Sequence, residues 1–215
     1  MSDLKPITLY VHARGPNPKK VIIFLEELGV PYNSVVIANS KEESYLAINP
    51  NGRLPAIVDP NNDDLTLWES GAILEYISEK YDGDNKFSPV TDKEKWQAKQ
   101  YLHFQMSGQG PYYGQYMWFN FFHPEQVPSA KERYGEQIVR VFGVLDRILK
   151  DKEYLVGDRL TYVDLAFIPW DKLALGVLDG ELAKKYDVEN KYPNFYAWHK
   201  RLVERPSVTK AFTEA

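Results

Sequence analysis

Two short segments within the first eighty residues carry groups suited to binding a small peptide. The first is residues 49–59, Asn-Pro-Asn-Gly-Arg-Leu-Pro-Ala-Ile-Val-Asp, in which 56–58 is predicted to be a short buried strand. Pro55 at the start of that strand removes one N–H from the ladder, so Leu54 keeps backbone groups that need a partner. If the Leu54–Pro55 bond is cis, as a tight turn favours, Leu54 can pair in strand fashion with an extended peptide.

The second segment is the pair Glu69-Ser70, which lies where a strand is expected to give way to a helix. A helix start offers free N–H donors and partial positive charge. Ser70 can therefore donate to a carboxylate while Glu69 accepts from an ammonium, as the end of an α-amino acid requires. An isolated Glu-Ser pair is more often a helix cap beside a solvated charge. The X-Pro edge upstream favours the binding interpretation.

Composition narrows the classes of partner. The chain has 215 residues, 44% of them hydrophobic, which is enough for a sizeable core. Its net charge is −4 and no basic cluster is longer than the pair Lys19-Lys20, so nucleic acid and anionic membranes are poor partners. No apolar run approaches the roughly 18 residues that a membrane span needs. We therefore expect a cytosolic protein that binds a small molecule or another protein.

The absence of cysteine from the sequence restricts the chemistry further. With no Cys there is no disulfide, no thiolate metal ligand and no cysteine nucleophile. If thiol chemistry occurs at this site, the ligand must supply the thiol. The four histidines share no ligand spacing, and we expect no metal site; they are His12, His103, His123 and His199.

Strand and helix patterns alternate over the first eighty residues. Two early strands around one helix form a βαβ crossover, and two later short strands form a hairpin before another helix. The predicted segments are strands 7–12, 35–37, 56–58 and 65–68, and helices 21–28, 45–48 and 73–81. This order predicts an α/β thioredoxin-like domain over residues 1–82.

Beyond a polar connector, every periodic segment has helical spacing, which predicts an all-α domain over residues 92–215. Gly108, Gly110 and Pro111 indicate a break in a long helical stretch. Thr161 and Asp164 fit a capping box, with Thr161 as N-cap. The expected helices are 93–122 with that break, 130–149, one that begins after Thr161, and a last one from about 193 that stops before Pro206.

Taken together, these motifs resemble the cytosolic glutathione transferases over essentially the whole chain. The X-Pro turn, the Glu-Ser pair and the 161–164 capping box occur together in that family. Residues 15–21, 107–110 and 118–123 resemble fungal members related to the yeast nitrogen-regulator prion protein. The resemblance implies the glutathione transferase fold, a homodimer, and glutathione as a co-substrate with no other cofactor.

A transferase must stabilise the glutathione thiolate, because a free thiol has a pKa of about 8.5 and is mostly protonated at pH 7. The first strand-to-helix turn contains no Tyr, Ser or Cys. Asn17-Pro18 reads as a helix start, with Asn17 as N-cap and Pro18 at the first helical position. The resemblance implies that Asn17 donates to the sulfur and that Arg14 adds positive charge or lines the second-substrate site. A plain capping role for Asn17 stays open.

The remaining assignments follow from charge and from the resemblance. The glycyl carboxylate of glutathione needs a cation, for which Lys41 and Arg53 are the candidates. An electrophile pocket is expected between the two domains. Aromatic residues of the helical domain are candidates to line it, although such residues are more often core or dimer contacts; the candidates are Tyr112, Tyr113, Tyr116 and Trp170.

Three functions compete at this stage. The first is an enzyme that conjugates glutathione to small hydrophobic electrophiles or uses it to reduce peroxides and mixed disulfides. The second is a binding protein of the same fold, either a regulator or a translation-factor subunit. The chain has neither the Asn/Gln-rich N-terminal extension expected of the regulator nor the further C-terminal domain expected of the translation factor. The third, a dithiol oxidoreductase, is excluded because the chain has no cysteine.

Overall fold

The computed structural model describes residues 4–177 and 182–213, which form two compact units. Unit 1 runs to Ser88 and includes the chain from Glu204 onward, and unit 2 is Pro89–Val203. The sequence-based division at 82 and 92 places the whole C-terminal segment in the helical domain. In the structure the last helix packs instead on the first unit, so unit 2 is inserted between two parts of unit 1.

Unit 1 contains a four-stranded sheet in its described residues, with strand order β2-β1-β3-β4. β1 and β2 are parallel, as the crossover predicts, and β3 and β4 are antiparallel, as the hairpin predicts. β3 also pairs antiparallel with β1. The elements are β1 (Ile7–Val11), α1 (Pro16–Leu28), β2 (Tyr32–Val36), α2 (Glu43–Leu46), β3 (Ala56–Asp59), β4 (Leu65–Trp68), α3 (Ser70–Tyr81) and α11 (Pro206–Thr213).

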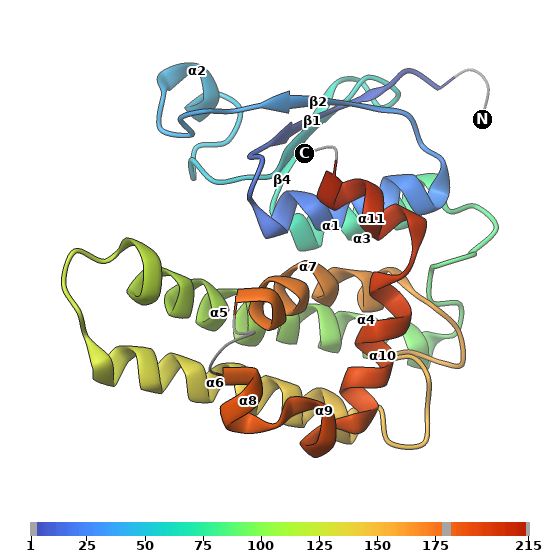
Figure 1. Ribbon diagram of the computed structural model, residues 1–215. Helices are drawn as coiled ribbons and strands as arrows, with labels where there is room; N and C mark the ends of the chain where they lie inside the picture. The colour runs from blue at the N-terminus through green and yellow to red at the C-terminus, as the bar shows by residue number, and fades with distance from the viewer. Residues whose placement is uncertain (1–3, 178–181, 214–215) are drawn as a thin grey trace. The chain divides into compact units, whose positions relative to one another are not determined.

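Apolar periodicity explains how the helices of unit 1 pack. α1, α3 and α11 lie on one side of the sheet (Figure 1). The run Val21 to Leu25 on α1 is buried, as are Ile73, Leu74 and Ile77 on α3. Gly29 ends α1 with φ 66°, the left-handed conformation that glycine adopts without steric cost. This packing brings the N-terminal ends of α1 and α3 toward the same region of the sheet.

The short helix α11 is absent from the sequence-based prediction, which ends the last helix before Pro206. Three polar contacts attach α11, together with Arg205 directly before it, to α1. Glu27 accepts two hydrogen bonds from the Arg205 guanidinium, at 2.6 and 2.7 Å. Lys210 pairs with Glu26 at 2.8 Å, and Lys19 donates to the Ala211 C=O at 2.7 Å. Side-chain pairing between residues about 180 positions apart gives no local signal in the sequence.

Unit 2 is helical throughout its described residues. The predicted break in the long helix is the π-helical turn η1, after which Pro111 lies in the first turn of α5, where a missing N–H costs nothing. The elements are α4 (Asp92–Phe104), η1 (Gln105–Gln109), α5 (Gly110–Met117), η2 (Trp118–Phe122), α6 (Pro128–Ile148), α7 (Tyr162–Val177), α8 (Leu182–Tyr186), α9 (Val188–Lys191) and α10 (Pro193–Val203).

The core of unit 2 is organised around the Asp164 carboxylate, which is fully buried. It accepts from the N–H groups of Leu155 and Thr161 at 2.8 and 3.0 Å, and from the Thr161 hydroxyl at 2.9 Å. The indole N–H of Trp198 on α10 donates to it as well, at 3.0 Å. The carboxylate half of the predicted capping box is therefore present, and it also joins α7 to α10.

A membrane-spanning role finds no support in these elements. Among the residues that the structure describes, no helix is both long enough and apolar enough to cross a bilayer.

Candidate active site

The segment before β3 has the geometry that the X-Pro motif predicts, and the Leu54–Pro55 bond is cis. The Arg53 C=O accepts from the Tyr45 hydroxyl and from the Asn49 side-chain amide, both at 2.7 Å. Two side chains from α2 and the turn that follows it thus fix the backbone just before Leu54. Leu54 lies outside β3, and its own N–H and C=O make no backbone hydrogen bond to the described residues. An extended peptide can pair there.

At the start of α3, Glu69 occupies the N-cap position and Ser70 is the first helical residue. Glu69 has φ 74° and ψ 112°, a conformation that non-glycine residues rarely adopt and that functional sites often contain. The Glu69 side chain makes no capping hydrogen bond, and Ser70, as the first helical residue, does not occupy the N-cap position that the plain capping interpretation gives it. The first-turn N–H groups of a helix carry partial positive charge, which suits the start of α3 to a carboxylate.

Lys20 is a member of this site that sequence reasoning missed. It is 1% exposed, and its ammonium lies 3.3 Å from the Ser70 Oγ, to which it donates. Burial lowers the pKa of Lys20 to about 7, against the opposing effect of the Glu69 charge. The spacing between Asn17 and Lys20 could have indicated this position, because residues three apart share one face of a helix.

The first turn of α1 differs from the prediction. Gly15 is the N-cap, with φ −76° and ψ 123°, and the helix begins at Pro16 rather than at Pro18. Either proline can occupy the first turn without loss of a hydrogen bond, and the earlier one starts the helix. Asn17, expected as N-cap, is thus the second helical residue, and its half-buried side chain is not committed to that capping role.

Arg14 lies just before α1, in a turn closed by a hydrogen bond from the Gly15 N–H to the His12 C=O at 2.9 Å. The Arg14 side chain is exposed, whereas its backbone N–H donates to the His12 Nδ1 at 3.3 Å. The turn is therefore fixed at the backbone, and the Arg14 guanidinium extends from it into solvent.

The two candidate cations for a ligand carboxylate meet at one turn. Lys41 donates to the C=O groups of Asn51 and Gly52 at 3.2 and 2.9 Å. Gly52 has φ 58°, and a Cβ there would lie 2.7 Å from the Lys41 ammonium. Arg53 follows directly and is exposed. Lys41 thus stabilises the turn that carries Arg53 and Leu54.

The predicted aromatic candidates divide between two faces of α5. Trp170 on α7 packs on the glycine face of α5, because Cβ atoms at Gly110 and Gly114 would lie 3.4 and 3.5 Å from its indole. At 100° per residue, Tyr112 and Tyr116 are on the opposite face. Tyr112 contacts Tyr134 on α6, with ring centroids 6.4 Å apart. Tyr113 is fully buried and meets Trp170 edge to face.

A buried polar cluster lies next to Trp170. Asp171 is fully buried, and it accepts from the Gln109 amide at 2.8 Å and from the Tyr113 hydroxyl at 3.2 Å. Burial raises the pKa of Asp171 well above its usual value, although the hydrogen bonds from Gln109 and Tyr113 act in the opposite direction. This cluster ties α7 to η1 and α5 beside the Trp170 indole.

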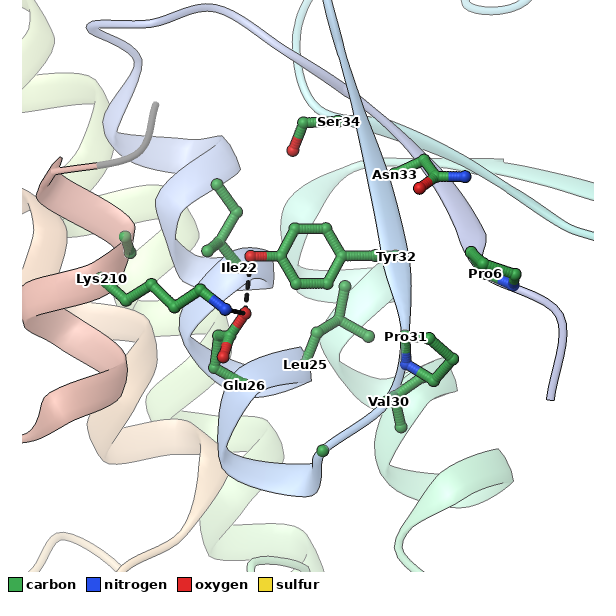
Figure 2. A pocket seen from close by; sticks show the side chains of 12 residues that line it. Pro6, Ile22, Leu25, Glu26, Val30, Pro31, Tyr32, Asn33, Ser34 and Lys210 are labelled. Carbon is green, nitrogen blue, oxygen red and sulfur yellow. Dashed lines mark hydrogen bonds and ion pairs between the residues drawn. The ribbon is translucent and has the colours of Figure 1, made fainter. Parts of the chain in front are cut away.

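A cavity of about 700 Å³ lies in unit 1, beside the C-terminal half of α1. Figure 2 shows Tyr32 and Lys210 converging on the Glu26 carboxylate at its wall, with Tyr32 donating at 2.8 Å. Asn17 lies at the opposite end of α1. The cavity includes none of the residues proposed for the peptide site, and its polar wall attaches β2 and α11 to α1.

Two family models match the chain: the glutathione S-transferase N-terminal domain over residues 5–79 and the C-terminal domain over residues 111–206. Glutathione S-transferase 2 of Schizosaccharomyces pombe is 48% identical to it, across 96% of this chain and 95% of that protein.

Solved structures of Phanerochaete chrysosporium proteins are similar over nearly the full length. The glutathione transferase URE2P6, in complex with oxidized glutathione, has 46% identity and a TM-score of 0.91, covering 100% of this chain and 98% of that one. Ure2p5, cocrystallized with 1-(S-glutathionyl)-2,4-dinitrobenzene, has 41% identity and a TM-score of 0.89, covering 98% and 94%. Matching domains in this order, with relatives at this identity, place the chain in the glutathione S-transferase family, in its fungal Ure2-related branch.

Proposed function

We propose that this glutathione transferase holds glutathione in an extended conformation along the segment before β3 and the start of α3. The backbone of Leu54 pairs with the cysteinyl residue, while Glu69 and Ser70 bind the γ-glutamyl end. The observation that carries the proposal is the Leu54 backbone, left without a backbone partner in the described residues and followed by the cis bond to Pro55. The Phanerochaete complexes, one with oxidized glutathione and one with a glutathionyl conjugate, support glutathione as the ligand.

The glycyl carboxylate is assigned to the turn that carries Lys41 and Arg53. Arg53 is the better direct ligand, because Lys41 already donates to two backbone carbonyls at that turn. A guanidinium also binds a carboxylate through two parallel hydrogen bonds, which an ammonium cannot do.

Activation of the thiol is assigned to the first turn of α1. The first-turn N–H groups of a helix carry partial positive charge, which favours the thiolate. Asn17 lies in this turn and supplies an amide donor to the sulfur, and the exposed Arg14 adds positive charge nearby. The chain contains no cysteine, so the reacting thiol is that of glutathione.

In the reaction, the glutathione sulfur forms a bond to an electrophilic carbon and a leaving group departs with the electron pair of the broken bond. Tyr112 and Tyr116, which share one face of α5, are proposed to contact the hydrophobic electrophile, and peroxides are a second substrate class. Trp170 packs on the opposite face of α5 and is proposed to position that helix instead. We also propose that the protein acts as a cytoplasmic homodimer.

Turnover by the purified protein tests the function. With glutathione and 1-chloro-2,4-dinitrobenzene we expect S-aryl conjugate and chloride in equal amounts, and cumene hydroperoxide and hydroxyethyl disulfide are assayed in parallel. Ser70→Ala should raise the KM for glutathione on the order of tenfold, because it removes a bond to a charged group. Ser34→Ala on the exposed strand β2 is the matched control. Binding without turnover of any substrate would favour a regulatory protein, and absence of binding would overturn the site.

A further inference from the structure

Lys20 combines two features that are unfavourable in a ligand-free protein. Its side chain is buried in unit 1, where an ammonium loses its hydration. It also points at Ser70, at the positive end of the α3 dipole. Hydrophobic packing alone would favour an apolar residue at this position of α1. A cation beside a helix start and a hydroxyl instead forms a site suited to an anion.

The hydrogen bond between Lys20 and Ser70 sets the direction of the Ser70 hydroxyl. Because the ammonium can only donate, the Ser70 Oγ accepts from it. The hydroxyl hydrogen must therefore point away from Lys20, and a carboxylate bound at the start of α3 can accept from it. Lys20 need not touch the ligand, since it acts through Ser70 and through its charge.

Few other charges bear on Lys20. Glu69 at the start of α3 is the charged side chain that acts on it, and it favours the ammonium form. The neighbouring Lys19 on α1 directs its ammonium away, to the Ala211 C=O on α11. Burial and the Glu69 charge therefore act on the pKa of Lys20 in opposite directions, and an anion bound beside Ser70 would act in the same direction as Glu69.

We propose that Lys20 is a positioning residue for the γ-glutamyl α-carboxylate, and that it takes up a proton when this carboxylate binds beside Ser70. The inference rests on the proposed function and adds a residue and a proton linkage to it. Glutathione binding thereby becomes tighter as the pH falls toward neutrality from above.

The expected size of this effect follows from the ligand-free state. With a pKa of about 7, Lys20 is about half neutral at pH 7 and mostly neutral at pH 8. The carboxylate favours the charged form, so proton uptake should be small at pH 6, about half a proton at pH 7 and close to one at pH 8. The affinity should weaken by up to about tenfold per pH unit above pH 7.

Calorimetric titration with S-methylglutathione measures this uptake, because the methylated sulfur has no proton to release. Binding enthalpies in phosphate and in Tris at pH 6, 7 and 8 give the number of protons taken up by the wild-type protein. An analogue with 4-aminobutyrate in place of the γ-glutamyl residue lacks the α-carboxylate. It should bind more weakly and without the proton uptake.

Two substitutions distinguish the effect of the Lys20 charge from the effect of its titration. Lys20→Arg keeps a charge that does not titrate, so it should bind S-methylglutathione with no proton uptake and a flat pH dependence. Lys20→Met should also show no uptake and should bind on the order of tenfold more weakly at pH 6. Lys19→Met, at a buried neighbour that does not point at Ser70, should keep the wild-type uptake.

The outcomes are distinguishable. If the wild-type protein binds with equal enthalpies in both buffers at pH 8, no proton is taken up. That result would overturn the role of Lys20 while leaving glutathione binding intact. It needs no variant, so it holds even if a substituted protein fails to fold. Proton uptake that persists in Lys20→Arg would assign it to another group and would overturn the inference as well. Absence of any binding would overturn the proposed function itself.

Discussion

Asn17 is the residue on which thiol activation can be judged most directly. If it donates one neutral hydrogen bond to the sulfur, its removal should cost about 0.5–1.5 kcal/mol. We therefore expect Asn17→Ala to lower kcat/KM by about tenfold at most and to raise the pKa of bound glutathione, measured from the pH dependence of the rate. Asn33→Ala, on the exposed strand β2, is the matched control. A loss of a thousandfold or more would instead make Asn17 essential to the chemistry.

His199 on α10 makes a separate residue-scale prediction, about stability. Its Nδ1 is buried with no hydrogen-bond partner in the described structure. Burial, assisted by the Lys172 charge, lowers the pKa of His199 to about 3. The unfolded chain binds this proton near pH 6.5, so the stabilising contribution is complete above that pH and is lost on acidification.

The expected loss is about 1.4 kcal/mol for each pH unit below about 6.5, down to about pH 3. Urea unfolding of wild type and His199→Gln between pH 7 and 5 should show that the variant lacks this slope. His103→Gln, at an exposed position, should keep it. Equal slopes in wild type and His199→Gln would show that His199 is not held neutral.

The sequence predicted some site residues far better than others. The cis bond at Leu54–Pro55 and the helix start at Glu69 and Ser70 were predicted correctly because backbone chemistry and turn chemistry are local, and the binding role of these residues stays a prediction. Lys20 was harder to find: its spacing from Asn17 indicates a shared helix face, but its contact with Ser70, fifty positions away, gives no local signal, and an isolated lysine on a helix is usually solvated. Asn17 was placed at the wrong helical position because two prolines in one turn can each begin a helix.

At the scale of elements, the contact between α11 and α1 rests on two adjacent acidic residues with different surroundings. The Glu27 side chain is 8% exposed and accepts from Arg205 and from the Ser207 hydroxyl, whereas Glu26 and its partner Lys210 are 20% and 42% exposed. Hydrogen bonds to buried charged groups are worth more than surface ion pairs.

We accordingly expect Glu27→Gln to lower the free energy of unfolding by about 1.5–3 kcal/mol at pH 7. Glu26→Gln, the matched control one residue away, should cost less than about 1 kcal/mol. Burial alone raises the pKa of Glu27, but the hydrogen bonds from Arg205 and Ser207 outweigh it and lower that pKa.

The pH dependence of the Glu27 contribution follows from this lowered pKa. The contribution is complete above about pH 4.5, the usual value, and is lost as the pH falls through the lower folded value. Denaturant titrations at pH 7, 4 and 3 should show the difference between wild type and Glu27→Gln shrinking with acid. A constant difference would place the cost in packing rather than in the charge.

Element prediction succeeded where hydrophobic periodicity decides the structure. Each of the four strands has a predicted counterpart, and β1 was the clearest because it alternates between buried and half-buried positions. β2 begins at Tyr32, three residues before the predicted strand 35–37, because its mostly exposed residues show no such alternation. α11 was missed because Pro206 served as a stop signal, although a proline can equally begin a helix. Eight residues also carry too few apolar positions for a clear helical pattern, and α11 is held largely by contacts with distant residues of α1.

At the scale of the whole molecule, the chain leaves unit 1 at Ser88 and returns to it at Glu204. The sequence predicted two domains in the correct order, since the change from mixed to helical periodicity is visible near residue 82. It could not predict the return, which depends on contacts between α1 and α11. Unit 1 is therefore complete only when the end of the chain is present.

This discontinuity makes a prediction for a truncated protein. Removing everything after Val203 deletes the Arg205 and Ser207 bonds to Glu27 and exposes α1 surface that Val208 and Ala211 cover, both being buried. The loss of these contacts should destabilise unit 1 by about 3 kcal/mol or more. Unit 2 retains all of its own elements and should be affected much less.

Hydrogen exchange resolves the two units in one experiment. In the truncated protein, amides of β1 and α1 should lose protection by roughly a hundredfold, while those of α6 and α7 keep most of theirs. A chain ending at Thr213, which retains α11, is the control and should match wild type. If protection fell equally in both units, opening of unit 1 would require opening of unit 2, and α11 would stabilise the fold as a single cooperative structure.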